Sequence, residues 1–394
     1  MKVDPAAWLD RPGIKRLLKA LDAKSGTARF VGGAVRDLLL GVPHDDLDLA
    51  TTIPPDEVVR RLEAAGIKAV PTGIEHGTIT AVSSATVVEV TTLRSDVSTD
   101  GRRATVAFTD DWREDAGRRD FTINALYADP FTGELSDYFG GLNDLDSRTV
   151  RFIGDPLQRI AEDHLRILRY FRFHARYGHG EPDPQAIAAC TERANDLMAL
   201  SRERIADELL KLLALADPTP TVRLMIAIGL FAPVLPEIEE TSRLSRLIET
   251  EHQAGIGADP LRRLATLLPA DAAVAERVAA RLKLSNKARK RLAIAASPSP
   301  ESSPRALAYR LGVEGAVDRL LLESRPTDAA SIAGWTPPRL PIGGGDLIAR
   351  GVPQGPAVAK NLQAIERSWV AAGFPAGKDF EVLVSKSLSD TAKA

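Results

Sequence analysis

Two aspartates separated by one residue carry the clearest chemical signal in the sequence. Asp46-Leu47-Asp48 alternates charged and apolar residues, and Leu49 continues the alternation. Residues two apart in a strand point to the same face, so we expect the two leucines to face the core and Asp46 and Asp48 to face outward together. Their like charges repel, and a divalent cation such as Mg²⁺, which prefers hard oxygen ligands, offsets that cost. Taken alone, Asp-x-Asp is more often a solvated strand edge than a metal site.

A pair of glycines precedes these aspartates, between an apolar stretch and a helical pattern. Gly32 and Gly33 have no Cβ atoms, so a phosphate could approach their backbone N–H groups, and the N-terminus of the following helix would favour its negative charge. Arg36 could reach the same anion. A plain tight turn is the commoner origin of a glycine pair, but the nearby Asp46 and Asp48 favour a phosphate site.

Glu89 is a candidate for a third carboxylate. It lies in the β-rich segment 86–92, where Val88 and Val90 are expected on one face and Glu89 on the other. A strand glutamate flanked by valines is otherwise a surface residue. Beside the two aspartates we favour a functional role.

A second group of charged residues follows further along the chain. Arg118, Arg119 and Asp120 precede an apolar pattern that continues to Leu126 and predicts a helix. Two arginines and an aspartate at a helix start could hold a triphosphate and a ribose. The alternative is a pair of surface charges with the aspartate as a helix cap.

Arginines also line the segment from Arg159 to Arg176. On a single helix its five arginines fall within an arc of about 140°, opposite four apolar residues. Such a face is usually only solvated, but Glu162 and Asp163 lie among or beside the arginines instead of alternating with them. Mixed carboxylates and guanidinium groups at fixed positions can bind the edge of a base. The arginines are Arg159, Arg166, Arg169, Arg172 and Arg176, and the apolar residues are Ile160, Ile167, Leu168 and Phe171.

These residues need a scaffold of mixed secondary structure. Strand and helix patterns alternate over residues 1–150, which predicts an α+β region with a small mixed sheet. After Pro156, helical patterns dominate, so we expect an all-helical remainder. The expected strands are 28–31, 46–51, 67–71, 77–83 and 86–93, and the expected helices are 5–24, 34–40 and 53–65.

The composition excludes several classes of protein. Of the 394 residues, 44% are hydrophobic and 26% charged, which is ordinary for a globular protein and argues against disorder. The net charge of −2 excludes a generally basic nucleic-acid binder, so local clusters must hold any anionic partner. No apolar run predicts a membrane span, and the N-terminus predicts no secretory signal. The lone Cys190 excludes an internal disulfide framework and fits a buried filler in a cytoplasmic protein.

Three blocks of the sequence together resemble the class II tRNA nucleotidyltransferase and poly(A) polymerase family. They occur in the order and spacing of that family and cover residues 28–178, with weaker similarity at 200–205 and 345–348. Jointly they are very specific. The blocks are Gly-Gly-Ala-Val-Arg-Asp-Leu-Leu-Leu-Gly with Asp46-Leu47-Asp48, Arg-Arg-Asp-Phe-Thr-Ile-Asn-Ala-Leu at 118–126, and Arg159 to Phe173 with Glu162-Asp163 and Arg166.

The resemblance implies a fold and an activity. It implies a head with a polymerase-β-type nucleotidyltransferase sheet at 1–150, a helical neck at 151–220 that recognises the base, and a helical body and tail at 221–394 that bind tRNA. The implied reaction adds C, C and A to the 3′ end of tRNA from CTP and ATP, with Mg²⁺ and without a nucleic-acid template. The partner would be the acceptor stem and elbow of tRNA, in the cytoplasm.

The resemblance also implies roles for individual residues. Asp46 and Asp48 match the metal ligands, and Glu89 is similar to the third catalytic carboxylate. The other matching residues are implied to bind the nucleotide, although the sequence does not decide between Arg118 and Arg119. They are Gly32, Gly33, Arg36, Arg118, Arg119, Asp120, Glu162, Asp163, Arg166, Arg169 and Arg172.

Base selection would depend on Asp163 and Arg166, which are surface neighbours on a continuous helix. Cytosine and adenine both present an amino donor beside a bare ring nitrogen, whereas uracil and guanine present the reverse pattern. A carboxylate can accept the amino proton, and a guanidinium can donate to the ring nitrogen. The pair would thus accept C and A and reject U and G, while a movable segment such as Arg94–Ala116 adapts the pocket to the size of the base.

Alternatives remain within and outside the family. A poly(A) polymerase and an enzyme that adds only CC or only A share these motifs. In the family that the chain resembles, a shortened segment at the position of Arg94–Ala116 accompanies loss of the final A addition. The segment is not shortened here, which favours full CCA addition. A non-catalytic RNA-binding protein would not need clustered carboxylates that repel RNA. A basic cluster nearer the C-terminus could contact phosphates or form a solvated helix face. Its residues are Lys283, Lys287, Arg289, Lys290 and Arg291.

Overall fold

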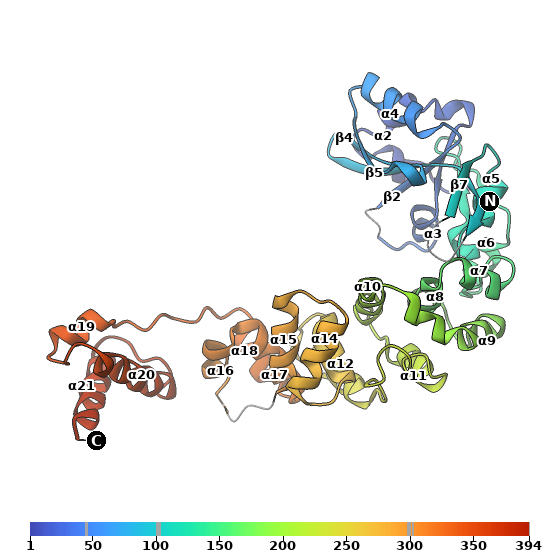
Figure 1. Ribbon diagram of the computed structural model, residues 1–394. Coiled ribbons are helices and arrows are strands. Elements are labelled where there is room, and N and C mark those ends of the chain that lie inside the picture. Colours follow the sequence, from blue (N-terminus) through green and yellow to red (C-terminus); the bar gives the residue numbers. More distant parts are fainter. Residues whose placement is uncertain (44–45, 100–103, 298–300, 302, 394) are drawn as a thin grey trace. The chain divides into compact units, whose positions relative to one another are not determined.

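The structure, a computed structural model of the chain, describes all residues except 44–45, 100–103, 298–300, 302 and 394. The chain folds into two compact units, whose elements are drawn in Figure 1. The domain boundaries expected at 150 and 220 stay a prediction. In the described part of the chain, no helix is long and apolar enough to cross a membrane. The first unit comprises Met1–Leu212 and Leu224–Val234, and the second comprises Leu213–Arg223 and Leu235–Ala394.

A seven-stranded sheet forms the centre of the first unit. Its strand order is β3-β4-β5-β2-β1-β8-β9, with β2 and β5 parallel and the other neighbouring strands antiparallel. All five strands expected from the sequence are present, and the α+β class is confirmed. The strands are β1 (Ala28–Val31), β2 (Leu47–Thr51), β3 (Lys68–Gly73), β4 (Thr78–Ser83), β5 (Thr86–Thr92), β8 (Leu126–Ala128) and β9 (Leu135–Asp137).

The alternation of residues in β2 determines what the sheet buries. Leu47 and Leu49 are buried, as expected, whereas Asp48 between them is half-buried. The core beside β1 includes Trp8, whose ring stacks on Phe30 with 4.3 Å between the ring centres. The helices that contact the sheet strands are α2 (Ile14–Ala20), α3 (Gly33–Leu39) and α4 (Pro55–Ala64).

The prediction of a single helix at 5–24 is wrong. The structure instead has α1 (Ala6–Leu9), α2 and a 3-10 turn, η1 (Ala23–Ser25). The first break falls at Pro12-Gly13, because Gly13 adopts a left-handed backbone with φ of 82° that a helix does not accept. The Ser83 hydroxyl at the end of β4 donates a hydrogen bond of 3.0 Å to the Gly13 carbonyl, so this turn is held against the sheet.

The segment after β5 contains strands that the sequence did not predict. β6 (Arg94–Thr99) and β7 (Ala104–Phe108) form a separate two-stranded sheet, and α5 (Trp112–Gly117) follows. The connection between the two strands, 100–103, lies outside the described residues. The segment that was expected to adapt the base pocket therefore contains regular secondary structure.

The helix expected at 118–126 is also wrong. Only a 3-10 turn, η3 (Thr122–Asn124), precedes strand β8. All three residues of β8 are 0% exposed, and a strand buried on both faces has the same continuous apolar pattern as a buried helix. The apolar pattern therefore predicted the burial of these residues correctly but predicted a helix where the structure has a strand.

The arginine-lined segment is two helices instead of the expected single helix. α7 ends at Glu162 and α8 begins at Leu165. Asp163 between them has an extended backbone, with φ of −152° and ψ of 106°, and its Oδ1 accepts the first N–H of α8 at 3.1 Å. The aspartate therefore ends α7 and caps α8. The helices of this region are α6 (Gly141–Asp146), α7 (Pro156–Glu162), α8 (Leu165–Tyr177), α9 (Pro184–Glu192), η4 (Ala194–Ala199), α10 (Arg202–Leu213) and α11 (Thr219–Ala227).

Helices are the regular elements of the second unit in its described residues. One of its apolar clusters contains Leu320 and Ile332, and another contains Trp369 and Phe380. The helical remainder expected from the sequence is confirmed. The helices are α12 (Ser242–Ala254), α13 (Pro260–Leu267), α14 (Ala272–Arg281), α15 (Asn286–Ala296), α16 (Pro304–Leu311), α17 (Val313–Leu322), α18 (Pro326–Ile332), α19 (Gly344–Ala349), α20 (Pro356–Ala371) and α21 (Gly377–Lys393).

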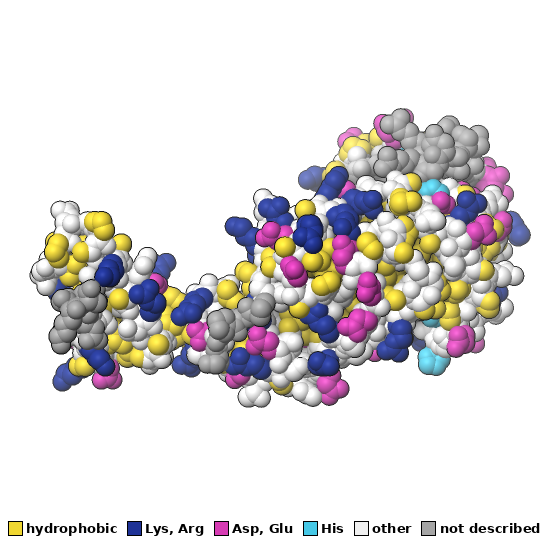
Figure 2. All heavy atoms as spheres, turned by 60° about the horizontal axis from the view of Figure 1, so that its bottom comes forward, with side chains coloured by type: hydrophobic (Ala, Val, Ile, Leu, Met, Phe, Trp, Pro, Cys, Tyr) yellow, Lys and Arg dark blue, Asp and Glu magenta, His cyan; other side chains and the backbone are white. Residues whose placement is uncertain are grey.

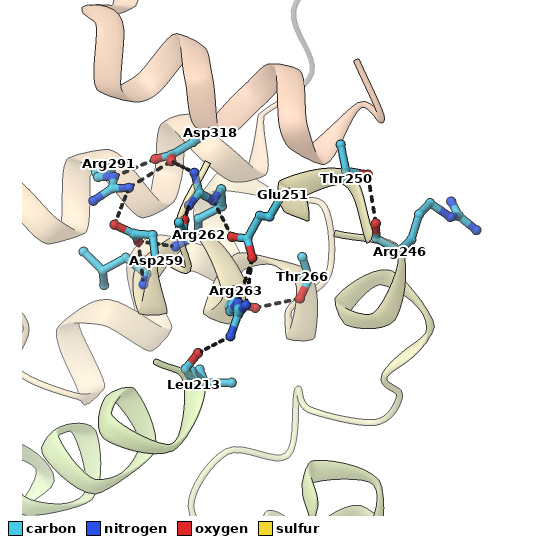
Figure 3. A network of polar contacts seen from close by, with 12 residues as sticks. Leu213, Arg246, Thr250, Glu251, Asp259, Arg262, Arg263, Thr266, Arg291 and Asp318 are labelled. Carbon is cyan, nitrogen blue, oxygen red and sulfur yellow. Dashed lines mark hydrogen bonds and ion pairs between the residues drawn. The ribbon is translucent and has the colours of Figure 1, made fainter. Parts of the chain in front are cut away.

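A buried network of charged side chains joins α12, α13, α15 and α17 (Figure 3). Arg262 and Arg263 of α13 both bind Glu251 of α12, with N–O distances of 2.9 Å for each pair. Arg291 of α15 binds Asp318 of α17 at 2.5 Å. All of these side chains are 2–3% exposed except Arg291, which is 13% exposed. The network therefore holds four helices together inside the unit.

Candidate active site

Three carboxylates lie together at the centre of the sheet. Asp48 of β2 pairs directly with Glu89 of β5, and Asp46 comes just before β2. They line a cavity of about 900 Å³, which is at the upper end of the range for ligand pockets. All residues that line this cavity belong to the first unit. They are Arg11, Pro12, Asp46, Leu47, Asp48, Ala85, Thr86, Val87, Glu89, Arg169 and Lys211.

The carboxyl group of Asp48 has a strongly raised pKa. Its burial, together with the neighbouring carboxylates of Glu89 and Asp46, raises its pKa from 3.8 to about 6, against the opposing effect of Arg119 and Arg36. The ionised form of Asp48 therefore costs free energy in the folded protein. A divalent cation bound to this carboxylate would remove that cost, so the residues present fit a metal site.

The three carboxylates are not arranged around a single ion position in this structure. Within the described ranges, no three His, Cys, Asp or Glu side chains are positioned to hold one ion. Asp46 and Glu89 are exposed, so their side chains can rotate toward Asp48. The three candidate ligands all offer oxygen atoms, which suits a hard cation.

The glycine pair lies at the junction of β1 and α3, where Gly32 precedes the helix and Gly33 begins it, on the β1 side of Asp48. Gly32 has φ of 64°, and a Cβ atom there would lie 3.4 Å from Nη1 of Arg119. A Cβ atom on Gly33 would lie 3.6 Å from Nη2 of Arg36. Both glycines thus lie beside guanidinium groups, and binding of a phosphate to their N–H groups stays a prediction.

Arg119, more than Arg118, is directed toward this loop and toward Asp48. Asp115 binds both arginines, at 2.7 Å from Arg118 and 3.1 Å from Arg119, and accepts a hydrogen bond of 2.6 Å from the Tyr127 hydroxyl. Burial alone would raise the pKa of Asp115, but Arg119 and Arg118 hold it well below its usual value. The carboxylate therefore stays charged and fixes both guanidinium groups. Arg119 also lowers the pKa of Asp48, which supports Arg119 as the nucleotide-binding member of the pair.

Arg36 is buried in this structure. It donates hydrogen bonds to Asp37 at 2.8 Å, to the Tyr177 hydroxyl at 2.6 Å and to the Asn124 side-chain oxygen. Its guanidinium also lies 4.0 Å from the centre of the Tyr177 ring. These contacts join α3 to the end of α8. Binding of a nucleotide to Arg36 stays a prediction and would require exchange of one of these contacts.

Acidic partners fix the two central arginines of α8. Arg169 binds Asp120 at 2.7 Å, and Arg172 binds Glu208 of α10 at 2.5 Å. Burial alone would raise the pKa of Asp120, but Arg169 outweighs it and lowers that pKa. Because the Arg169 side chain is 30% exposed and lines the cavity, it connects the turn at Asp120 to the carboxylates of the sheet.

The structure gives Asp163 and Arg166 separate partners. Arg166 binds Glu162 at 2.5 Å and donates to two backbone carbonyls, whereas Asp163 binds Arg204 of α10 at 2.8 Å. The expectation that they are neighbours on one helix is wrong, because Asp163 lies in the break before α8. The Asp163 side chain is 33% exposed, so a base can still reach it.

Several residues at the site escaped the sequence analysis. Glu208 and Arg204 lie on α10, where only weak similarity at 200–205 gave a signal. Arg11 lies in the turn before α2, and the adjacent Pro-Gly dipeptide is a turn signal that the helical pattern outweighed. Lys211 lies in an ordinary amphipathic helix and carries no motif.

The basic cluster of the second unit divides in two. Arg291 belongs to the buried network, where it binds Asp318 and also Asp259 at 2.8 Å. The other four members are exposed. On the face drawn in Figure 2, basic side chains are interspersed with acidic and hydrophobic ones, in keeping with the net charge of −2. An RNA contact would therefore depend on local groups of basic residues.

Two family models match the chain. The model described as "Poly A polymerase head domain" matches residues 28–151, and the one described as "Probable RNA and SrmB- binding site of polymerase A" matches residues 181–241. The first includes all three carboxylates and the glycine pair.

Curated relatives resemble the chain over most of its length. It is 35% identical over 391 residues to the mitochondrial CCA tRNA nucleotidyltransferase 1 of Mus musculus, which covers 93% of this chain and 88% of the relative. It is 34% identical to the CCA-adding enzyme of Lacticaseibacillus paracasei, over 91% of this chain and 92% of that one. The crystal structure of the Bacillus stearothermophilus CCA-adding enzyme in complex with CTP matches with a TM-score of 0.74 and 28% identity, over 98% of this chain and 100% of that chain.

Proposed function

Because the chain belongs to the tRNA nucleotidyltransferase and poly(A) polymerase family, we propose that it adds C, C and A to the 3′ end of tRNA from CTP and ATP, without a nucleic-acid template. The enzyme transfers nucleotides to the RNA and releases pyrophosphate. Its partners are the tRNA 3′ end and the two nucleotides. Similarity to CCA-adding relatives extends across both units, so it is not confined to a shared catalytic head.

The observation that carries this proposal is the register of β2 and β5. It sets Asp48 beside Glu89, close to Asp46, at the edge of an open cavity. Nucleotidyl transfer of this kind uses divalent metal ions, and we propose Mg²⁺, held by Asp46 and Asp48. Bound there, the ions would activate the 3′-hydroxyl of the RNA and stabilise the departing pyrophosphate.

The protein groups around the carboxylates would handle the proton and the triphosphate. Glu89 would accept the proton of the RNA 3′-hydroxyl or help to hold the metal ions. The N–H groups of Gly32 and Gly33 and the guanidinium of Arg119 would neutralise the triphosphate. Asp115 keeps Arg119 oriented before the substrate arrives, which is supported by the 3.1 Å ion pair between them.

Base selection would use Asp163 and Arg166, each with its own supporting partner. Asp163 would accept the amino proton of cytosine or adenine, and Arg166 would donate to the ring nitrogen. Glu162 holds Arg166 and Arg204 holds Asp163 in the free protein. Arg169 and Arg172, fixed by Asp120 and Glu208, would complete the pocket.

Full CCA addition is favoured over poly(A) synthesis or partial addition. Both relatives carry CCA in their names, and the segment between β5 and η3 is long enough to contain two strands and a helix. A non-catalytic RNA-binding role is disfavoured, because three carboxylates beside a cavity would repel RNA without serving it. We also propose a cytoplasmic location, supported by the single cysteine, Cys190, which is free and buried.

The test uses tRNA transcripts that end one, two or three nucleotides before the mature 3′ end. Each is incubated with Mg²⁺ and one nucleoside triphosphate, and the products are sequenced. We expect C at the first two positions, A at the third and no further addition. Runs of A would indicate a poly(A) polymerase, CC or A alone would indicate a partial enzyme, and no product would indicate an RNA-binding protein.

A further inference from the structure

The active-site cavity has a basic wall, and two of its residues lie outside the three sequence blocks that carry the family resemblance. Besides the three carboxylates, three cations line it: Arg11, Arg169 and Lys211. Arg11 precedes residue 28, where the match to the head model begins, whereas Lys211 lies within residues 181–241, which match the model described as a probable RNA and SrmB- binding site. We propose that Arg11 and Lys211 bind the phosphate groups of the last nucleotides of the acceptor RNA. This inference rests on the proposed function, since it concerns the RNA substrate of that reaction.

The backbone that carries Arg11 is fixed against the sheet. The Arg11 carbonyl accepts the N–H of Ile14 at 3.3 Å, and the Gly13 carbonyl accepts the Ser83 hydroxyl at 3.0 Å. A Cβ atom on Gly13 would lie 2.5 Å from the Ser83 carbonyl oxygen, so only a glycine lets the two backbones touch. Arg11, which lines the cavity, therefore belongs to a turn before α2 that is held against the end of β4.

The adjacent turn between β4 and β5 forms another part of this wall. Ser83 pairs with Thr86, and the two residues between them, Ser84 and Ala85, have φ of 49° and 68°. Two-residue hairpin turns of this type prefer Asn-Gly, because residues with a Cβ atom adopt positive φ only at a cost. Unfavourable backbone of this kind persists where the surrounding structure imposes it, often at functional sites. Ala85 and Thr86 line the cavity.

The strand order indicates which phosphates this wall would meet. Strand β2, which carries Asp48, has β5 on one side and β1 on the other. The cavity is lined from the β5 side, by Glu89 and the β4–β5 turn, whereas Gly32 and Arg119, both described, do not line it. In the proposed reaction the triphosphate binds near Gly32 and Arg119, and Glu89 accepts the proton of the RNA 3′-hydroxyl or helps to hold the metal ions that activate it. The RNA end must therefore enter from the β5 side, where Arg11 lies.

Charge also requires cations at this entrance. An RNA end that approaches three carboxylates is repelled, and each of its phosphates adds one negative charge. Arg11 and Lys211 offset that repulsion on the side where the RNA enters. Lys211 is paired with Asp207 at 2.6 Å, but their side chains are 54% and 60% exposed, and exposed pairs of this kind are weak. A phosphate can therefore replace Asp207 as the partner of Lys211.

The test measures steady-state kinetics for Arg11→Gln, Lys211→Gln and the double variant. The substrates are ATP and a tRNA transcript that ends in CC. Lys15→Gln is the matched control, because Lys15 is a 72% exposed cation on α2 that does not line the cavity. We expect each single variant to raise KM for the RNA about three- to tenfold, the effect of one lost charged contact. KM for ATP should stay unchanged, and the slope of log KM against log salt should fall by about one per variant.

Two outcomes of the kinetic measurements overturn the inference. A raised KM for ATP with an unchanged KM for RNA would assign the wall to the triphosphate. Unchanged constants for both substrates in an active variant would show that the wall binds neither. If Arg11→Gln lowers the melting temperature, Arg11→Lys must keep the wild-type KM for RNA, and Lys211→Gln tests the inference without altering the turn. An inactive wild-type enzyme would instead refute the proposed function.

Discussion

Arginines bind carboxylates in both units of the molecule, with opposite consequences. In the second unit, Arg262 and Arg263 are each 3% exposed and share the equally buried Glu251. In the first unit, the side chains of Arg169 and Asp163 are about one-third exposed, and Arg169 lines a cavity. The same residue types therefore form a closed core in one unit and an open site in the other.

The difference lies in how completely the hydrogen-bonding groups are used inside the protein. Arg263 donates to Glu251 and to the backbone carbonyls of Leu213 and Ala216, and Arg262 donates to Glu251 and to the Gly257 carbonyl. Such a network leaves no room for a ligand and stabilises the fold. A partly exposed carboxylate keeps lone pairs for a substrate. The open region, which comprises the residues that line the cavity together with Asp163, can therefore bind nucleotides.

The largest expected effect comes from Asp48→Asn in the open region. Losing a metal ligand should lower the rate of nucleotide addition on the order of 10³-fold or more. The free energy of unfolding should stay equal or rise. The folded protein raises the pKa of Asp48 to about 6, so ionisation of this carboxylate at neutral pH destabilises the fold, and the neutral asparagine removes that cost. Single-turnover addition of A to a transcript ending in CC and urea unfolding measure the two effects.

The matched control for this variant is Asp56→Asn, on an exposed aspartate of α4. It should leave the rate unchanged and lower the free energy of unfolding by no more than about 1 kcal/mol, the usual contribution of a carboxylate in the first turn of a helix. Near-normal turnover of a folded Asp48→Asn enzyme would remove the metal-binding role of Asp48.

The opposite pattern is expected for Glu251→Gln in the closed network. Two buried guanidinium groups would lose their shared counter-charge, so the free energy of unfolding should fall by about 3–5 kcal/mol. The rate per folded enzyme molecule should stay near the wild-type value, because Glu251 is not among the residues that line the cavity. Urea unfolding and active-site titration separate the two quantities. Glu249→Gln, on the same helix but exposed, serves as control; equal stability of the two variants would contradict a structural role for the network.

Local sequence patterns sufficed for the centre of the sheet. The alternation around Asp48 predicted the strand, its buried leucines and its outward aspartates, and the valines beside Glu89 predicted the orientation of that residue. These features depend only on the period of a strand. The family resemblance added the roles of these residues, which alternation alone left open between a metal site and a solvated edge.

Tertiary contacts determined what the sequence could not predict. Asp163 and His164 are both compatible with a helix, so the spacing of the arginines predicted one continuous helix. The helix is interrupted because the Asp163 side chain accepts the first N–H of α8 and binds Arg204. Arg291 read as part of an exposed basic cluster but is held by two aspartates from other segments. In both cases the partner comes from elsewhere in the chain, where periodicity carries no information.

A smaller effect should separate Asp163 from its ion-pair partner Arg204. Asp163→Ala should reduce discrimination of CTP and ATP against UTP and GTP by about 1–3 kcal/mol, because a bidentate base contact contributes that much. Arg204→Ala should leave the identity of the base contact intact and change selectivity less. Competition among the four nucleotides on transcripts ending in C and CC measures both. If Asp163→Ala retains wild-type selectivity, the arginines of α8 bind phosphate or RNA and do not select the base.

The smallest effect tests whether the open region is completed by a cation. The pKa of Asp48 is raised from 3.8 to about 6 in the folded protein, so this group contributes stability that is present below pH 4 and lost as the pH rises through 6. Mg²⁺ competes with the same proton and should recover that loss only above pH 6. At ten times its Kd, Mg²⁺ should stabilise the first unit by about 1.4 kcal/mol at pH 7.5 and by only about 0.4 kcal/mol at pH 5. Thermal unfolding at both pH values measures the difference. Asp48→Asn should abolish it and Glu251→Gln should preserve it, since only the open region takes the cation; a Mg²⁺ effect that is equal at both pH values would place the ion away from Asp48.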